Sequence, residues 1–154
     1  MISVSWKDFE SNVPELAEFG RDRLHGQVSY FATIRKNNLP RLHPVTPIIG
    51  EGHLYLFMEP TSPKRHDLIR GSAYVLHSSV ADNDGSNGEF QLTGFAKLIG
   101  DKAVWQQAAA LADFEFEFEI EVHHILFELG IVEAFSTVYR DEGPDRIRWK
   151  APTP

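Results

Sequence analysis

The chain has 154 residues, a formal net charge of −7 and a hydrophobic content of 42%, so it can bury a core of its own, and we expect a single domain over residues 1–154. The absence of cysteine excludes disulfides, thiolate metal sites and cysteine nucleophiles. A pI near 5.4 argues against general nucleic-acid binding, because that binding requires a basic face.

The N-terminal segment, MISVSWKDFE, has no basic region followed by an apolar one. We therefore expect no signal peptide and a cytoplasmic protein, with which the lack of cysteine is compatible. No apolar run approaches the roughly 20 residues of a membrane-spanning helix, so we also expect no membrane partner.

Residues 5–24 have the pattern of a helix in one or two pieces. Ser5 followed by Asp8 resembles a capping arrangement, and Pro14 suits the first turn of a second piece. The apolar residues that follow recur at helical spacing, so we expect this helix to pack one face against the core.

Three segments after this helix have the composition of β-strands, namely 28–34, 41–49 and 53–58. Short turn sequences separate them, so we expect a meander in which each strand pairs with the next. The second segment contains Pro44 and Pro47, which cannot donate ladder hydrogen bonds. We therefore expect that strand to lie at an edge, at a bulge or beside a ligand.

The rest of the chain alternates short helices with further strands. Helices are expected from Ser62 to Gly71 and, capped by Asp101, over 102–112. The expected strands are 73–79, 89–100 with a bend or bulge at Gly94, 125–139 and 146–150. This order predicts an α+β fold that is mainly β, an antiparallel barrel of about six to seven strands with an N-terminal helix and short peripheral helices.

The segment DFEFEFEIEV alternates acidic and apolar residues over 113–122. In an extended chain its glutamates share one face, namely Glu115, Glu117, Glu119 and Glu121. We interpret that face as a solvated one that protects a strand from edge pairing, in preference to a cation site. The histidines lack His-x-x-x-His spacing, and the adjacent His123 and His124 point apart on regular structure, so we expect no metal site.

The segment EPTSPKRHDLIRG places two cations in the first turn of its expected helix, where the helix dipole disfavours them by roughly 0.3–1 kcal/mol. One interpretation is an exposed basic turn. The other is a phosphate site, to which Ser62, Lys64 and Arg65 supply a hydroxyl group and charge. Arg41 or His43, on the preceding proline-bearing strand, could add a second cationic group. Such a site suits a phosphate monoester and not a triphosphate, because the Gly-rich loop with Lys-Ser/Thr is absent.

Two patterns over residues 28–101 point to a known family. The more specific one is an aromatic-ended strand followed by a short loop and Ser-x-Lys-x-x-x-Leu, here Ser62, Lys64 and Leu68. The weaker one is the strand GFAKLI, residues 94–99. In both respects the chain resembles the pyridoxamine 5′-phosphate oxidase-like family of FMN-binding split β-barrel proteins. The resemblance implies a split-barrel fold, a flavin cofactor, and a homodimer with the cofactor in a cleft between subunits.

The resemblance also implies roles for individual residues. Lys64 is the expected ligand of the flavin phosphate, with Ser62 beside it and Arg41 or His43 opposite. Residues on two strands are expected to line the isoalloxazine ring, namely Pro44, Val45, Thr46, Phe57 and Met58.

The chain departs from the biosynthetic oxidase in two places. That enzyme has an arginine directly before the lysine, where this chain has Pro63, and Arg65 is a candidate replacement. The arginine-rich C-terminal segment of the oxidase has only a faint counterpart in DRIRWKAP. The resemblance therefore implies flavin binding rather than vitamin B6 biosynthesis.

The leading hypothesis is an FMN-dependent oxidoreductase that acts on a small organic substrate. Tyr55, Tyr30 and His43 are conceivable proton donors, although a structural role is the preferred interpretation of each. One alternative is a reductase that uses a deazaflavin coenzyme, whose longer phosphodiester-containing tail would occupy the same basic site. Another is a non-enzymatic protein that stores or senses flavin or haem, in which His43, His123 or His124 is a candidate axial ligand.

Overall fold

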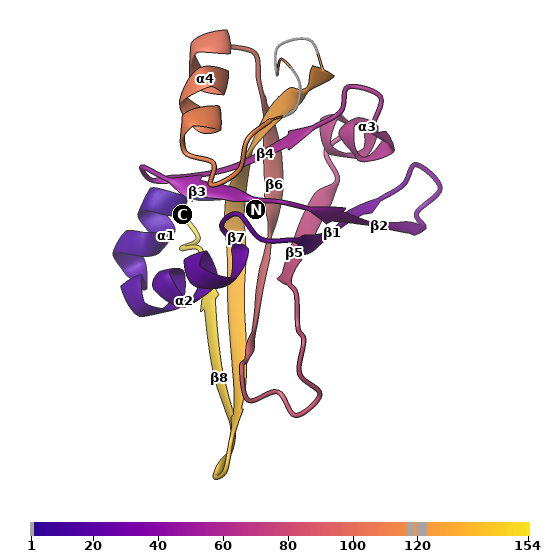
Figure 1. Ribbon diagram of the computed structural model, residues 1–154. Coiled ribbons are helices and arrows are strands. Elements are labelled where there is room, and N and C mark those ends of the chain that lie inside the picture. Colours follow the sequence, from indigo (N-terminus) through magenta and orange to yellow (C-terminus); the bar gives the residue numbers. More distant parts are fainter. Residues whose placement is uncertain (1, 117–118, 120–122) are drawn as a thin grey trace.

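The computed structural model describes residues 2–116, 119 and 123–154. In these ranges the chain forms one eight-stranded sheet and four helices (Figure 1). The helices are α1 (Trp6–Asn12), α2 (Pro14–Leu24), α3 (Pro63–Ile69) and α4 (Lys102–Ala110). None of the helices in the described ranges is long and apolar enough to cross a membrane.

The strands pair antiparallel throughout. They are β1 (Ser29–Ile34), β2 (Pro40–Val45), β3 (Ile48–Gly50), β4 (His53–Met58), β5 (Ala73–Ser78), β6 (Glu89–Ile99), β7 (Ile125–Arg140) and β8 (Gly143–Lys150). The predicted α+β class and its antiparallel strands are confirmed. The expected number of six to seven strands is too low, because the proline-bearing segment forms two strands instead of one.

The sheet runs in the order β2-β1-β5-β6-β7-β4-β3, and β8 pairs with β7. The expected meander is therefore wrong. β1 pairs with β2 and β3 pairs with β4, but β2 and β3 lie at opposite ends of this order. β4 pairs instead with β7, where Leu56 lies opposite Phe127. Turn residues specify hairpins between consecutive strands, whereas this long-range pairing depends on the burial of both strands.

The predicted strand over 41–49 is divided into β2 and β3, with Thr46 and Pro47 between them. Both strands lie at edges of the sheet order, and Pro44 lies opposite Tyr30 in the β1–β2 pair. A proline is tolerated at an edge because no second neighbouring strand needs its missing N–H group. Of the three explanations offered for the prolines, the edge position is confirmed.

β6 and β7 are the longest strands, and β7 continues into β8 in a hairpin that projects from the rest of the sheet (Figure 1). The β6–β7 register shifts between Thr93 and Gly94, which confirms the bulge predicted at that glycine. A Cβ atom on Gly94 would collide with the carbonyl oxygen of Gly130, and one on Gly130 would lie 2.6 Å from Ser3 Oγ. The two strands therefore approach each other here as only glycine permits.

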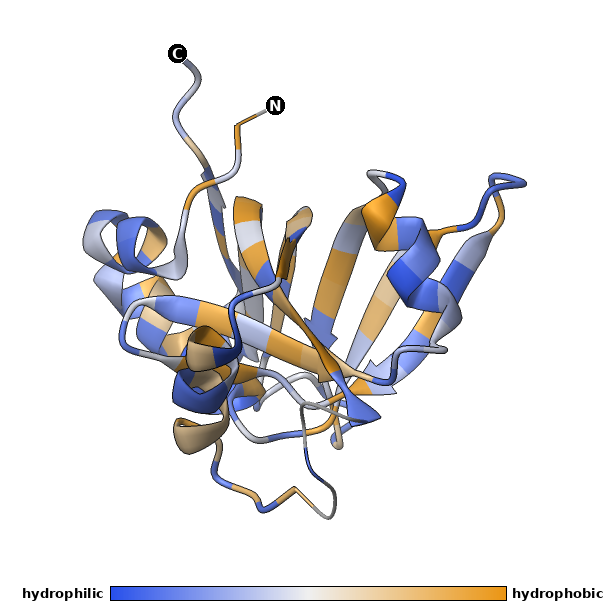
Figure 2. Cartoon of the chain, turned by 90° about the horizontal axis from the view of Figure 1, so that it is seen from above, coloured by the Kyte–Doolittle hydropathy of each residue, from blue (hydrophilic) through white to orange (hydrophobic). Residues whose placement is uncertain are grey.

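The main core lies between the sheet and the pair α1 and α2. Ser5 caps α1 by accepting the N–H group of Asp8 at 3.1 Å, and Val13 separates the two helices, so the two-piece interpretation is confirmed. α2 packs closely on β6 because Gly20 lies against the ring of Phe90. Seen from above, the strands curve in an arc, and hydrophobic positions recur along them (Figure 2). Buried members of this core include Trp6, Phe9, Leu24, Phe31, Leu76, Phe90, Leu92 and Phe127.

α4 covers a smaller core that includes Ile48, Tyr55, Trp105, Ala108 and Leu126. Its N-cap is Asp101, which accepts the N–H group of Ala103 at 2.9 Å, as predicted.

The acidic segment after α4, for which one face of glutamates was expected if it is extended, lies partly outside the described residues. Residues 113–116 form no strand. Phe114 and Phe116 pack their rings together and against the smaller core. Glu115 and Glu119 belong to the described residues, whereas Glu117 and Glu121 lie outside them. The interpretation of a solvated face with four carboxylates therefore stays a prediction.

Candidate cofactor site

Lys64 is the centre of the predicted phosphate site, and it is buried, with 9% of its surface exposed. Its Nζ donates a hydrogen bond to Ser62 Oγ at 2.9 Å. Ser62 occupies the N-cap position of α3 as predicted, but its side chain does not cap the helix. Because α3 has only seven residues, the site depends on these side chains and not on a helix dipole.

The environment of Lys64 disfavours its positive charge. Burial lowers the pKa of Lys64, and Arg41 lowers it further, while Glu59 opposes both effects. An ammonium group has three donors, and among the described residues Ser62 is the one hydrogen-bond partner that Lys64 has. A buried cation with unused donors is suited to an anionic ligand.

Asp67, on the next turn of α3, holds Arg41 in place. Arg41 Nε and Thr33 Oγ1 both donate to Asp67 Oδ2, each at 2.7 Å, and Arg70 Nη2 donates to Asp67 Oδ1 at 3.1 Å. The side chain of Asp67 is 3% exposed. Burial by itself would raise the pKa of Asp67, but the hydrogen bonds from Arg41, Thr33 and Arg70 outweigh it and lower that pKa. The carboxylate is therefore ionised at neutral pH and fixes the orientation of the Arg41 guanidinium.

His43 lies within electrostatic reach of the same cations. Burial lowers the pKa of His43, and Lys64, Arg41 and Arg35 lower it further, while Asp67 opposes them. The imidazole is consequently neutral at pH 7, and an anion beside it would favour its protonated form. Lys64 and Arg41 thus lie within electrostatic range of His43 and of each other.

Arg65, the neighbour of Lys64, is turned back along the chain. Its Nη1 donates to the carbonyl oxygen of Pro60 at 2.9 Å. Its Nε is buried and has no hydrogen-bond partner among the described residues. An unpaired buried donor costs about 1–3 kcal/mol, so this atom is open to a polar partner other than the described residues.

A hollow of about 350 Å³ lies where β2 ends and β3 begins. Its wall contains aromatic rings that contact each other, and Phe57 meets Phe116 edge to face with ring centroids 5.1 Å apart. A wall that carries aromatic rings suits a flat ring system. The hollow is lined by Pro44, Val45, Thr46, Ile48, Phe57, Phe114, Glu115, Phe116 and His124, so it gathers most of the residues predicted to face the isoalloxazine ring.

Met58 and the two candidate tyrosines lie elsewhere. Met58 is buried in the main core, because side chains alternate along β4 and Phe57 faces the hollow. Tyr55 packs in the smaller core, where burial first, and then Glu128 and Glu51, raise its pKa to about 12. Tyr30 is exposed on the outer face of β1. None of these three side chains lines the hollow.

Of the adjacent histidines, His124 lines the hollow and His123 does not. The ring of His124 lies edge to face against Phe57 and Phe116, with centroids 6.2 and 5.7 Å away. Its Nδ1 is buried and, within the described ranges, unpartnered. Burial lowers the pKa of His124, and His123 adds to this, while Glu59 opposes it. Among the residues that the structure describes, no three His, Asp or Glu side chains group so as to hold a metal ion.

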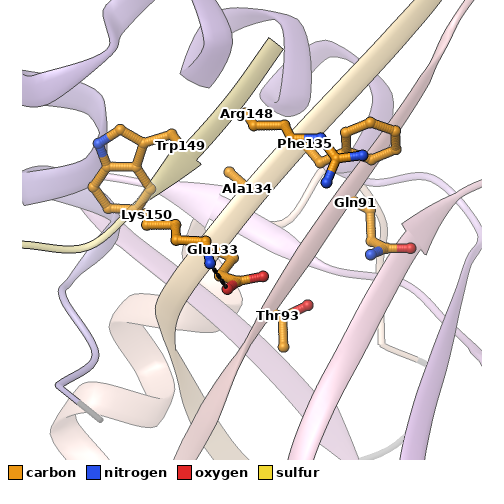
Figure 3. Close-up of a pocket in the computed structure, with 8 residues that line it drawn as sticks. All are labelled: Gln91, Thr93, Glu133, Ala134, Phe135, Arg148, Trp149 and Lys150. Atoms are coloured by element: carbon orange, nitrogen blue, oxygen red, sulfur yellow. Dashed lines mark ion pairs between the residues drawn. The ribbon is translucent and has the colours of Figure 1, made fainter. Parts of the chain in front are cut away.

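A separate hollow lies on the outer face of β6, β7 and β8 (Figure 3). In it Lys150 Nζ pairs with Glu133 Oε1 at 3.1 Å, and the Arg148 guanidinium lies 5.2 Å from the centroid of the Phe135 ring. The ring of Trp149 is turned away toward the main core. None of the predicted site residues lines this hollow, so we place the candidate cofactor site at α3 and at the end of β2.

The chain was compared with known proteins. No protein-family model matches it, and no curated protein matches it. Solved structures do match: a pyridoxamine 5′-phosphate oxidase-related, FMN-binding protein of Nostoc punctiforme is 12% identical with a TM-score of 0.64, over 99% of this chain and 94% of that one. This chain has the split-barrel fold of the pyridoxamine 5′-phosphate oxidase-like proteins.

Other split barrels similar to this chain carry different ligands in their names. An F420 reductase is 11% identical with a TM-score of 0.57, over 74% of this chain and 94% of that one. The haem-storage protein HutZ of Vibrio cholerae is 12% identical with a TM-score of 0.56, over 77% and 89% of the two chains. At such low identity the likeness establishes the split-barrel fold that the sequence resemblance implied, and it leaves the cofactor open.

Sequence reasoning missed the residues that position Arg41 in this split barrel. Asp67 and Arg70 are three residues apart in the predicted helix, and this i, i+3 spacing is a signal that could have indicated their ion pair. Thr33 and Arg41 are on strands far along the chain from Asp67, and no local pattern connects them with it.

Proposed function

We propose that this chain is a member of the pyridoxamine 5′-phosphate oxidase-like family, a cytoplasmic FMN-binding oxidoreductase that acts on a small organic substrate. The observation that carries the proposal is the buried Lys64–Ser62 pair with unused donors on α3, in a split barrel whose β2–β3 junction forms an aromatic-walled hollow. FMN has a phosphate at one end and a planar ring at the other, and these two surfaces match its two ends. When bound, the flavin supplies hydride transfer, and the protein supplies position and electrostatics.

The residues of the chain divide the binding task. Lys64 and Ser62 donate to the phosphate, and Arg41, oriented by Asp67, adds positive charge. Burial first, and then the nearby cations, lower the pKa of His43, and a bound dianion would oppose the part that is due to the cations. The buried Nε of Arg65 takes a polar group of the ligand as its partner. Pro44, Val45, Thr46 and Phe57 form the surface on which the ring lies.

We also propose a homodimer in which a second copy covers the outer face of β1 and β2. Tyr30 and Leu42 are 45% and 66% exposed on this face, and Val28 and Ile34 are exposed apolar residues beside them. Large apolar side chains that gather on one exposed sheet face favour a protein partner. Analytical ultracentrifugation at micromolar concentration tests this proposal, and a monomer would contradict it.

Substitution of the central cation tests the cofactor assignment. Lys64→Ala removes a charge-assisted hydrogen bond worth roughly 1.5–3 kcal/mol, so FMN should bind roughly 10- to 150-fold more weakly. Riboflavin lacks the phosphate, so its affinity should change far less. Both affinities can be measured by quenching of flavin fluorescence.

Lys97→Ala serves as the matched control, because Lys97 is an exposed lysine on β6 outside the lining of the hollow. It should leave both affinities within about twofold of the unsubstituted protein. Equal losses for FMN and riboflavin in the Lys64 variant would show that Lys64 does not bind the phosphate. Turnover with a reduced nicotinamide then separates an enzyme from a flavin carrier.

Haem binding is a second candidate, because His124 offers at the hollow a buried Nδ1 that has no partner among the described residues. The absorbance spectrum after incubation with each cofactor separates the candidates, since a flavin band, a deazaflavin band and a haem Soret band do not coincide. If haem is bound, His124→Ala should shift the Soret band, and His123→Ala should not. A protein that retains the deazaflavin coenzyme in preference to FMN would favour the deazaflavin-dependent reductase.

A further inference from the structure

A second basic hollow, of about 430 Å³, lies between α3 and the turn that joins β1 to β2. In Figures 1 and 2 this turn and α3 lie beside each other at one side of the barrel. The turn contributes Arg35, Lys36 and Asn37 to its lining, and β2 contributes Arg41. None of these residues except Arg41 belongs to the cofactor site described above.

α3 presents a single face to this hollow. Its lining residues are Pro63, His66, Asp67 and Arg70, which recur at the i, i+3, i+4, i+7 spacing of one helix face. Lys64 is not among them, so the two basic regions lie on different faces of the same helix. Arg41 is the residue that the two regions share.

The charges in this hollow do not balance. Arg41 Nε and Arg70 Nη2 each donate to one oxygen of Asp67, and Arg70 also donates to the carbonyl oxygen of Ile34 at 3.0 Å. These bonds satisfy the single carboxylate of the hollow. In the described part of the chain, the side chains of Arg35 and Lys36 make no hydrogen bond or ion pair, and Arg41 uses only its Nε.

The lining of this hollow carries four cations against one carboxylate, in a chain of net charge −7. Elsewhere among the described residues, Lys150 pairs with Glu133 and Arg140 pairs with Asp145. Here the acidic neighbour is already saturated by Arg41 and Arg70, and guanidinium groups recognise phosphate and carboxylate oxygens in particular.

We propose that this hollow is a second anion subsite, which takes a phosphate or carboxylate group through Arg35, Lys36 and the free Nη atoms of Arg41, apart from the Lys64–Ser62 site. The effect of Arg35 on His43 supports the closeness of the two subsites, because Arg35 and Lys64 both lower the pKa of that histidine. The subsite does not require that the first site bind FMN. It takes either a free anion or a second anionic group of a ligand held in the first site.

Inorganic pyrophosphate is the probe, and its binding is measured by isothermal titration calorimetry. The test variant combines Arg35→Ala with Lys36→Ala, two substitutions on an exposed turn outside the core. The control variant combines Lys97→Ala with Arg146→Ala, which removes the same charge from exposed positions on β6 and β8. Pyrophosphate should bind the test variant about tenfold or more weakly than the unsubstituted chain, and the control variant within about twofold.

Two outcomes of this titration overturn the subsite. One is a lack of pyrophosphate binding to the unsubstituted chain, and the other is an equal loss in the test and control variants, which would reflect net charge alone. A third measurement separates this subsite from the first. Pyrophosphate should still bind the Lys64→Ala variant through Arg35 and Lys36, and a complete loss of binding in that variant would show that there is one anion site. This measurement uses pyrophosphate alone, so its result does not depend on whether the chain binds FMN.

The source of the anion follows from a comparison of two flavins. FAD carries a second phosphate that FMN lacks, so a loss of FAD affinity without a loss of FMN affinity in the test variant assigns the subsite to a group of the same ligand. Unchanged affinity for both flavins, together with lost pyrophosphate binding, assigns it to a separate anion. A parallel loss of FMN affinity would place the FMN phosphate itself in this hollow and overturn the second subsite.

Discussion

α2 and α3 both pack on the sheet, but they bury different chemistry. The buried residues of α2 are Leu16, Ala17, Gly20 and Leu24, whereas those of α3 are Lys64, Asp67 and Leu68. Apolar burial stabilises a fold by roughly 25 cal/mol per Å², while a buried charge needs a partner to offset the loss of its hydration. The part of the barrel that α2 covers (the α2 end) therefore contributes mainly to stability. The part at α3 (the α3 end) instead buries charged groups with which a ligand can pair.

The polar groups of α3 also differ from one another in how completely they are paired. At α3, Asp67 receives three side-chain hydrogen bonds, yet Lys64 makes one and Arg65 Nε makes none among the described residues. A site that only held the fold together would gain from pairing every one of these groups. The unpaired donors of Lys64 and Arg65, on the same short helix as the fully paired Asp67, are therefore what a ligand-binding site would require.

Phe90→Ala at the α2 end should cause the largest loss of stability. Phe90 is fully buried against Gly20, and removal of such a ring costs about 3–5 kcal/mol in the free energy of unfolding. Urea denaturation measures the loss. Ile147→Ala is the control, because Ile147 is 44% exposed and should change stability by less than about 1 kcal/mol. A loss no greater than that of the control would remove the stabilising role assigned to this end.

Asp67→Asn should cause an intermediate loss, because it weakens the hydrogen bonds from Arg41, Thr33 and Arg70. We expect about 2–3 kcal/mol at pH 7. The pKa of Asp67 is lowered in the folded state, so its contribution is complete above the unfolded value of about 3.9 and is lost as the pH falls through the folded pKa. Urea denaturation at several pH values should therefore show the difference between the two proteins shrinking below about pH 4. A difference independent of pH would mean that the ionised carboxylate is not the stabilising group.

Lys64→Met should have the smallest effect and the opposite sign. The lowered pKa of Lys64 means that the fold disfavours its charge, so an apolar side chain of similar length should raise the stability of the ligand-free protein by about 1 kcal/mol. The gain should be largest at neutral pH. It should shrink as the pH rises from the folded pKa toward the unfolded value of about 10.4, where the native lysine is also neutral. Thermal unfolding with and without FMN is the measurement. Without FMN the variant should be more stable than the unsubstituted protein, and added FMN should no longer stabilise it.

Local patterns predicted local structure well in this chain. Ser5 and Asp101 cap their helices, Pro63 begins α3, and Gly94 marks a bulge, because each of these signals acts within a few residues. The strand order could not be obtained in this way. β4 pairs with β7, which follows it by about 70 residues in the sequence, and this pairing depends on burial of both strands and not on a local turn.

The candidate site shows the same limit. Ser62 and Lys64 are two residues apart, and a sequence motif places them correctly beside each other. Asp67 meets Arg41 across 26 residues of chain and Thr33 across 34, so their contacts exist only once β1, β2 and α3 are assembled. Met58 was expected at the ring and lies in the core, because adjacent residues of a strand face opposite sides.

The crossing of β6 and β7 limits what an engineer can change in this barrel. Most core side chains can be exchanged for others of similar volume, since their neighbours can shift to accommodate them. A methyl group on Gly94 would instead meet the main-chain oxygen of Gly130, which cannot move without displacing the strand that pairs with β4, β6 and β8. Any redesign of either cofactor surface should therefore keep glycine at these two positions, whatever else in the sequence is replaced.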